Sequence, residues 1–177
     1  MISSLIKKCL NNDRAAQKQL YLEHCQRLMG IAFRYATDMD EAKDIVQNTF
    51  IRIFNKLDAY DNTYGNFLAW SKTICIREAI AIKRKNSKII FKEDIIEIAE
   101  KEGQYMEITD LSDKELKDIV DYLPDNHKTI LMMFYYDDLS HKEIATLLEI
   151  KESSSRSRLT RAKQELTLQW KLANGLY

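Results

Sequence analysis

The sequence has little of the turn chemistry on which sheet proteins depend. Its 177 residues include four glycines and one proline, whereas tight connections between strands draw heavily on both residue types. Since 45% of the residues are hydrophobic, the chain still has enough apolar material for packed cores. We therefore expect an all-α fold, of a size for one ordinary domain or two small ones.

Long apolar runs are also absent. A helix needs about 20 mostly apolar residues to cross a bilayer, and the longest uninterrupted run covers only residues 130–136, as in a buried core segment. The apolar run in the N-terminal MISSLIKK is too short for a signal peptide. We expect no direct membrane insertion and a cytoplasmic location.

Residues suited to metal or covalent chemistry are sparse. Cys9, Cys25 and Cys75 are odd in number and lack metal-ligand spacing, which indicates reduced thiols. The three histidines are scattered, and the sequence holds neither a glycine-rich phosphate loop nor a nucleophile elbow. We therefore expect no catalytic residues, no metal and no cofactor, and the protein is not expected to be an enzyme.

The formal net charge of zero arises because charged segments of opposite sign cancel. Residues 61–92 contain seven basic and two acidic residues, a net charge of +5. Residues 93–121 contain three basic and eleven acidic residues, a net charge of −8, and residues 151–163 contain five basic and one acidic residue, a net charge of +4. Two basic patches separated by an acidic stretch indicate nucleic acid as a partner for both patches.

Helical periodicity organises the first half of the chain. An N-cap at Asn12 or Asp13 starts a helix that runs to about Ala36, and Asp38 with Glu41 offers a capping arrangement for a second helix. The apolar stripe of this second helix consists of Ala42, Ile45, Val46, Phe50, Ile53, Phe54 and Leu57.

A loop and a further helix follow this stripe. The loop DAYDNTYGN covers residues 58–66, the helix covers about residues 67–85, and four helices over residues 1–87 would share the core of a small bundle. The acidic segment that follows could be a strand, a short helix or a tether, and its periodicity does not decide among them. We treat it as a linker.

A second bundle is predicted beyond the linker. Residues 114–122 are expected to be helical, and Leu123-Pro124 fits the start of the next helix, with the proline in its first turn. The buried side of that next helix is predicted to consist of Ile130, Leu131, Phe134 and Tyr135.

The stretch LSHKEIATLLEIKESSSRSRLTRAKQEL, residues 139–166, predicts a helix-turn-helix. Ser140 and Glu143 have capping-box spacing, so the first helix should begin at about His141. The turn carries Glu149 where glycine is common, and a left-handed conformation there would cost on the order of 1 kcal/mol. The apolar stripes of the two helices consist of Ile144, Ala145 and Leu148, and of Leu159, Ala162 and Leu166.

The opposite face of the second of these helices carries hydroxyl and cationic side chains. Such groups read base edges and bind phosphates in a major groove, which favours DNA recognition over an ordinary solvated face. The face consists of Ser153, Ser157, Thr160 and Arg161, with Ser154, Arg156 and Arg158 on its flanks.

Two features of the first bundle also indicate binding. The loop and the following helix combine aromatic rings, asparagines and cations, a mixture that holds single-stranded nucleic acid unless Phe67 and Trp70 are core residues and the cations are merely solvated. The mixture consists of Tyr60, Asn62, Tyr64, Asn66, Phe67, Trp70, Lys72, Arg77, Lys83 and Arg84. The polar face of the preceding helix is either a docking site or an ordinary wet face, and it consists of Asp44, Gln47, Asn48 and Ile51.

Two segments carry a family resemblance. The run YATDMDEAKDIVQNTFIRIFNKLDAYD resembles the central region of the first domain of bacterial RNA polymerase sigma factors, whose pattern is close to D-x-x-D-A-E-D-[LI]-V-Q-E-[TV]-F. The run LPDNHKTILMMFYYDDLSHKEIATLLEIKESSSRSRLTRAK resembles the second domain of the short extracytoplasmic-function (ECF) class of these proteins. Both occur in the family's order, and the two domains that they resemble would together span nearly the whole chain.

The resemblance implies a factor that binds core RNA polymerase, directs it to specific promoters and assists promoter melting, without catalysis of its own. Residues 1–90 would form the region 2 domain, which binds polymerase and recognises and melts the −10 element. Residues 91–113 would be an acidic linker near the path of emerging RNA, and residues 114–177 would form the region 4 domain, which reads the −35 element. The class also implies an anti-sigma factor as a partner.

Site residues follow from the same resemblance. Those implied to bind polymerase are Asp44, Gln47, Asn48 and Ile51. Those implied at the −10 element, where the loop would capture a flipped base, are Asn62, Tyr64, Asn66, Trp70, Arg77, Lys83 and Arg84. Those implied to contact the −35 element are Ser153, Ser154, Arg156, Ser157, Arg158 and Arg161.

Some positions depart from the family pattern. Arg77 and Ala81 stand where asparagine and an acidic or amide residue are frequent, and Asn48 replaces a common glutamate. Lys151 stands at the usual serine cap of the recognition helix, which allows the cap to shift to Ser153. Two rival interpretations remain open: a stand-alone helix-turn-helix regulator, which would bind duplex DNA tightly without polymerase, and an adaptor whose bundles bind other proteins.

Overall fold

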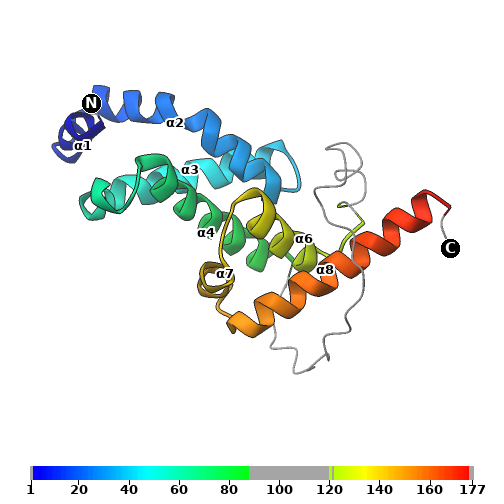
Figure 1. Ribbon diagram of the computed structural model, residues 1–177. Coiled ribbons are helices and arrows are strands. Elements are labelled where there is room, and N and C mark those ends of the chain that lie inside the picture. Colours follow the sequence, from blue (N-terminus) through cyan, green and yellow to red (C-terminus); the bar gives the residue numbers. More distant parts are fainter. Residues whose placement is uncertain (1, 88–119, 121, 176–177) are drawn as a thin grey trace. The chain divides into compact units, whose positions relative to one another are not determined.

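The computed structural model describes residues 2–87, 120 and 122–175, and the regular secondary structure of these residues is entirely helical (Figure 1). The chain divides into two compact units, Met1–Ile89 and Ile90–Tyr177. The predicted all-α fold is therefore confirmed. Within the described residues, no helix is both long enough and apolar enough to cross a bilayer.

The first unit is a bundle of four helices (Figure 1). Helices α2 and α4 pack against each other, α3 packs against both, and α1 lies against α2. Side chains that are almost fully inaccessible to solvent form its core, among them Leu20, Leu28, Tyr35, Ile45, Ile53 and Ile76. The helices are α1 (Ile2–Leu10), α2 (Arg14–Tyr35), α3 (Met39–Asn55) and α4 (Phe67–Ser87).

Side-chain caps start two of these helices, as the sequence predicts. The Asp13 carboxylate accepts hydrogen bonds from the backbone N–H groups of Ala15 and Ala16, which makes Asp13 rather than Asn12 the N-cap of α2. Asp38 caps α3 in the same way. Its predicted partner Glu41 accepts instead from the Thr37 N–H, at 2.6 Å, one residue before the cap.

The predicted loop between α3 and α4 contains two short 3₁₀ turns, η1 (Leu57–Ala59) and η2 (Asn62–Tyr64). Gly65 follows them with φ of 134°, a backbone conformation that favours glycine. The loop therefore enters α4 through a position at which a side chain would introduce strain.

The second unit contains α6 (Asp125–Leu131), the π-helix η4 (Met132–Tyr136), α7 (His141–Leu148) and α8 (Glu152–Ala173). Helix α8 packs against α6 and α7. Pro124 is the N-cap of α6 and not a residue of its first turn, so the predicted start was one residue early. The core of the unit includes Val120, Leu123, Leu131, Ala162 and Leu166.

The π-helix corrects the predicted buried side of this segment. The Asp137 N–H donates to the Met132 carbonyl, five residues earlier, at 3.1 Å. This wider turn rotates the side chains away from the spacing of an α-helix. Met133 is therefore fully buried, whereas Phe134 and Tyr135 are only half-buried.

Two predicted segments fall largely outside the described residues. The acidic linker, residues 91–113, lies wholly outside them. Of the helix predicted over residues 114–122, the structure describes only Val120, which is helical, and Tyr122, which lies in a turn.

Candidate nucleic-acid interface

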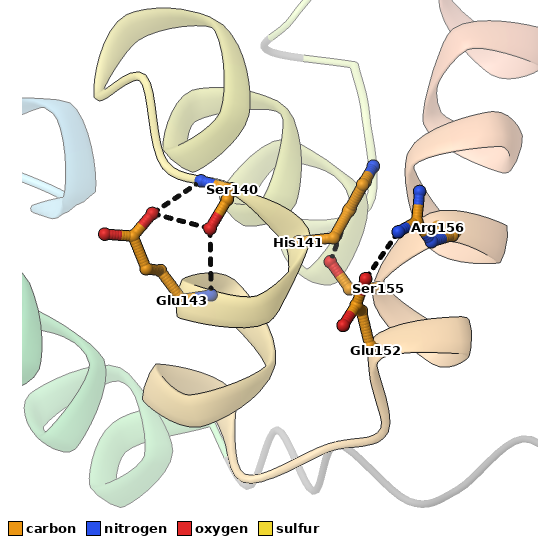
Figure 2. Close-up of polar contacts among 6 residues, drawn as sticks. All are labelled: Ser140, His141, Glu143, Glu152, Ser155 and Arg156. Atoms are coloured by element: carbon orange, nitrogen blue, oxygen red, sulfur yellow. Dashed lines mark hydrogen bonds and ion pairs between the residues drawn. The ribbon is translucent and has the colours of Figure 1, made fainter.

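The helix-turn-helix of the second unit begins with the predicted capping box (Figure 2). The Ser140 hydroxyl accepts a hydrogen bond from the Glu143 N–H, and the Glu143 carboxylate accepts from the Ser140 N–H at 2.8 Å. Ser140 and Glu143 therefore satisfy each other's backbone donors at the start of α7. Ile144, Ala145 and Leu148 form the buried side of α7, as predicted.

The turn between α7 and α8 adopts the left-handed conformation at Glu149, with φ of 54° and ψ of 45°. Helix α8 then begins at Glu152, with Lys151 as an N-cap that makes no side-chain capping hydrogen bond. The N-cap of α8 is therefore Lys151, and the shift to Ser153 that the sequence allowed does not occur.

A polar contact joins α7 to the first turn of α8 (Figure 2). His141 Nδ1 lies 2.9 Å from the hydroxyl oxygen of Ser155, which is inaccessible to solvent. The imidazole also stacks on Phe134, with 4.9 Å between ring centroids. Burial lowers the pKa of His141, and the nearby Arg156 lowers it further. The neutral imidazole therefore ties the recognition helix to the helix before it.

The predicted recognition face of α8 is only partly exposed. Ser153 and Arg156 are exposed, whereas Ser154, Ser157, Thr160 and Arg161 are half-buried. Arg158 is a correction, because its side chain is buried, with 3% of its surface exposed. It lies one turn before Ala162 on the stripe that packs into the unit, and so it does not belong to an accessible DNA-binding surface.

The carboxylate of Glu152 pairs with the guanidinium of Arg156 one turn further along α8 (Figure 2). The pair lies at the N-terminal end of the helix, where Ser153 is also exposed. The end of α8 that would enter a groove therefore carries a cation and a carboxylate in contact, and not an isolated cation.

In the first unit, aromatic rings gather where the loop meets α4. The Tyr60 ring lies 5.4 Å from that of Phe67 and 5.3 Å from that of Trp70, measured between centroids. Phe67 is buried, as expected if it is a core residue, whereas Trp70 is half-buried. The cluster anchors the loop to the first turn of α4 and leaves part of the Trp70 ring accessible.

Hydrogen bonds within the loop fix its shape. The Asp61 carboxylate accepts from the Thr63 N–H at 2.9 Å, a contact that lowers the pKa of Asp61. The Asn66 side-chain oxygen accepts from the Ala69 N–H at 2.9 Å, as a capping residue of α4 does. The Tyr60 hydroxyl donates to the Gly65 carbonyl at 3.3 Å.

The loop, α1 and α2 enclose a pocket of about 990 Å³. Asn62, Thr63 and Asn66 line it from the loop, Lys8 from α1, and His24 from α2. The pocket thus brings together two of the predicted −10 residues. Tyr64 belongs to η2, but its side chain lies outside the described residues.

The predicted cations of α4 continue from the loop along the helix. Trp70, Arg77 and Arg84 recur every seven residues, a spacing that places them on one face of an α-helix. Arg77 is exposed, and Lys83 and Arg84 are half-buried. The aromatic cluster and a row of basic residues therefore share one helix.

The predicted docking face on α3 is accessible. Asp44, Gln47 and Ile51 are exposed, with 51% of the Ile51 surface accessible, and Asn48 is half-buried. The opposite side of the helix is buried through Ile45, among others. The face is therefore accessible to a partner, although a single exposed aliphatic side chain is also common on ordinary surfaces.

Sequence reasoning missed the wall of the pocket that α1 and α2 provide. Lys8, Glu23, His24 and Arg27 line it, but they come from helices that were interpreted only as scaffold. The available signal was His24, which occupies a position on the buried stripe of α2 four residues after Leu20 and four before Leu28. A histidine on an apolar stripe marks either the core or the edge of a site.

The described residues hold no group of three or more His, Cys, Asp or Glu side chains that could bind a metal ion. The three cysteines are free thiols, of which Cys9 and Cys75 are buried and Cys25 is half-buried. Burial raises the pKa of Cys9, which keeps that thiol protonated.

Helical bundles with a helix-turn-helix in one and a loop-bordered pocket and basic helix in the other define a two-unit nucleic-acid-binding protein. Comparison with family models specifies the class. Residues 20–89 match the model of sigma-70 region 2, and residues 113–166 match that of sigma-70 region 4. Together the two matches cover well over half of the chain, in the family's order. The chain belongs to the sigma-70 family of RNA polymerase sigma factors, in its ECF class, whose members are transcription initiation factors that give RNA polymerase its promoter specificity.

Individual relatives agree with this assignment. The chain is 29% identical to the RNA polymerase sigma factor SigV of Bacillus subtilis over 83% of its own length and 86% of that protein. It is 26% identical to the ECF RNA polymerase sigma factor SigW of Bacillus subtilis over 96% of both chains.

Two solved structures share the fold. The sigma factor RpoE of Bartonella quintana, in complex with the anti-sigma factor NepR, has a TM-score of 0.57 and 24% identity, covering 87% of this chain and 96% of that one. CnrH, in complex with the cytosolic domain of CnrY, has a TM-score of 0.53 and 18% identity, covering 93% of each chain.

Proposed function

We propose that the protein binds core RNA polymerase, directs it to promoters through separate contacts with the −35 and −10 elements, and helps to melt the DNA. The observation that carries this proposal is that one chain combines matches to sigma regions 2 and 4, each on a compact helical unit. Residues 1–90 act on polymerase and the −10 element, and residues 114–177 act on the −35 element.

The −35 element is read by α8 from the major groove. Ser153 and Arg156 are exposed near its N-terminal end, and Ser154, Ser157 and Arg161 flank them. Hydroxyl groups bind phosphates or base edges, and arginine binds the O6 and N7 acceptors of guanine. The His141–Ser155 contact supports this role, because it fixes α8 against α7.

The −10 element is read by the loop and α4. A base extruded from the duplex costs a few kcal/mol, which a pocket must offset by stacking and hydrogen bonding. Asn62 and Asn66 offer amide groups to the pocket, and Tyr60, which lines it, packs against the ring of Trp70. Arg77, Lys83 and Arg84, together with Tyr64, would bind the adjacent strand and so favour the melted state.

Polymerase docks on α3 through Asp44, Gln47, Asn48 and Ile51. The exposed Ile51 would be buried in that contact, and the surrounding carboxylate and amide groups would give it orientation. An anti-sigma factor is a further proposed partner, because the sigma factor RpoE of Bartonella quintana was solved in complex with the anti-sigma factor NepR. The proposed place of action is the cytoplasm, with polymerase.

Co-elution with core RNA polymerase on gel filtration, followed by transcription from a pool of genomic fragments, tests the proposal. We expect one stable complex and transcripts that begin at a shared promoter motif. A well-folded chain that fails to associate with polymerase but binds duplex DNA tightly alone would contradict the proposal and indicate a stand-alone regulator. Absence of both activities would indicate an adaptor.

A further inference from the structure

The ion pair between Glu152 and Arg156 stands at the end of α8 that faces DNA in the proposed function. The side chains of Arg156 and Glu152 are 62% and 44% exposed, so both are accessible to a ligand. Arg156 is the only exposed arginine among the proposed −35 contacts, since Arg161 is half-buried and Arg158 is buried. The carboxylate of Glu152 therefore holds the one exposed arginine among the proposed −35 contacts.

We propose that Glu152 is a specificity-determining residue, whose carboxylate positions the Arg156 guanidinium for the edge of a guanine base and disfavours its binding to phosphates. This inference rests on the proposed function, because it assumes that α8 enters the major groove. It predicts a G·C pair at the −35 position that Arg156 reads.

Geometry favours this role. A guanidinium is planar and carries more N–H donors than a single carboxylate contact uses, so Arg156 can keep its contact with Glu152 and still donate to O6 and N7 of guanine. A free arginine side chain is flexible and reaches any nearby phosphate. Pairing with a residue one turn earlier on the same helix restricts the guanidinium before DNA arrives, which reduces the entropy lost on binding.

Electrostatics supports the inference that Glu152 disfavours binding of Arg156 to phosphates. Phosphate contacts supply most of the affinity for DNA of any sequence, and a carboxylate beside the cation repels those phosphates. A titratable group close to the pair is His141 of α7, whose pKa burial and Arg156 lower and Glu152 raises. With its pKa below the ordinary value, His141 is neutral at pH 7 and does not compete with Arg156 for the carboxylate.

A purely structural role for Glu152 is the competing explanation. A carboxylate in the first turn of a helix stabilises it through the helix dipole. Replacement with glutamine would then weaken the start of α8 without altering which base is preferred. Base preference and non-specific affinity therefore distinguish the two roles.

The experiment compares the full chain with E152Q, R156A and the double variant, each reconstituted with core RNA polymerase. Transcription from promoters randomised over the −35 element gives the base preference, and titration with duplex DNA lacking a promoter, at several salt concentrations, gives the non-specific affinity. E165Q is the matched control, because it removes one carboxylate from α8 about one turn beyond Arg161, the last of the proposed contacts. Circular dichroism checks that each variant folds.

In the wild type we expect a guanine preference of about tenfold or more, as for a bidentate arginine contact. E152Q should reduce it by about threefold or more and raise non-specific affinity about twofold to fivefold at low salt. R156A should abolish the preference, with no further effect of E152Q, and E165Q should resemble the wild type. A wild-type preference that E152Q leaves intact would overturn this inference alone, whereas absence of any promoter-dependent transcription would overturn the proposed function with it.

Discussion

His24 places an imidazole at the edge of the pocket with both ring nitrogens buried, and neither has a hydrogen-bond partner. The ring packs at a tilt against Phe67, with 4.7 Å between centroids. Burial is the main cause that lowers its pKa from the ordinary value of 6.5. In the unfolded chain the imidazole takes up a proton near pH 6.5, but in the folded chain it does so only at lower pH. Above pH 6.5 the imidazole is neutral in both states, and as the pH falls below 6.5 the folded chain loses stability because protonation favours the unfolded chain.

Replacement of His24 with phenylalanine should reduce this acid sensitivity. The H24F variant should also be more stable at pH 7.5, by about 1 kcal/mol, because it removes a buried polar atom without a partner. Thermal unfolding of the full chain, followed by circular dichroism at pH 7.5 and pH 5.5, measures both effects. If Tm falls equally in H24F and the wild type between pH 7.5 and pH 5.5, this explanation is contradicted. His141, whose pKa is also lowered, accounts for the acid sensitivity that remains in H24F.

Glu149 stores backbone strain in the helix-turn-helix, because its φ of 54° lies in the left-handed region. Replacement with glycine should increase the free energy of unfolding of the second unit by about 1 kcal/mol. Amide hydrogen exchange of α7 and α8 in the full chain measures this, as slower exchange. The matched control is T146G, an exposed position inside α7, where glycine should be destabilising by about 1 kcal/mol. Faster exchange in E149G would show that contacts of the glutamate side chain outweigh the strain.

At the scale of the helix, the capping box of α7 predicts a local loss of stability. Removal of the Ser140 hydroxyl in S140A leaves the Glu143 N–H without its acceptor, at a cost of about 1 kcal/mol. Amides in the first turn of α7 should exchange faster, and S140T, which keeps the oxygen, should restore most of the protection. Unchanged exchange in S140A would mean that packing alone fixes the start of this helix.

Elements with both a cap and a regular apolar stripe could be predicted from the sequence. Helix α3, with Asp38 as its cap, and α7, with Ser140, begin where local hydrogen bonding requires. The π-helix could not be predicted, because the expected buried side assumed the spacing of a regular α-helix, and the wider turn changes which residues are buried. For Arg158, charge indicated exposure, whereas its place on the Ala162 stripe buried it.

At the scale of the whole molecule, the face on α3 predicts a loss of polymerase binding that leaves the fold intact. Combined replacement of Asp44 and Gln47 with alanine should weaken binding to core polymerase by about tenfold, or 1.4 kcal/mol, while the circular dichroism spectrum stays unchanged. The matched control is K18A with Q26A, two exposed polar positions on α2. Unaltered affinity in the α3 variant would place the docking surface on another part of the chain.

The candidate site was only partly predictable, because it is assembled from distant segments. The aromatic and amide groups of the loop were visible as a composition, and the structure gathers Asn62 and Asn66 at one pocket. The opposite wall comes from α1 and α2, more than thirty residues earlier in the sequence. No local pattern in those helices indicates that they face the loop, since their contribution depends on how the bundle folds.

This shared wall has a consequence for building chimeric factors. The match to region 2 begins at residue 20, yet Lys8 and Leu5 of α1 line the pocket beside the loop. An exchange of residues 20–89 with a relative would set a foreign loop against the original α1, whereas an exchange that starts before Ile2 would transfer both walls together. The smallest unit that can be exchanged with its pocket complete is therefore longer than the matched segment by residues 2–19, which contain α1 and the start of α2.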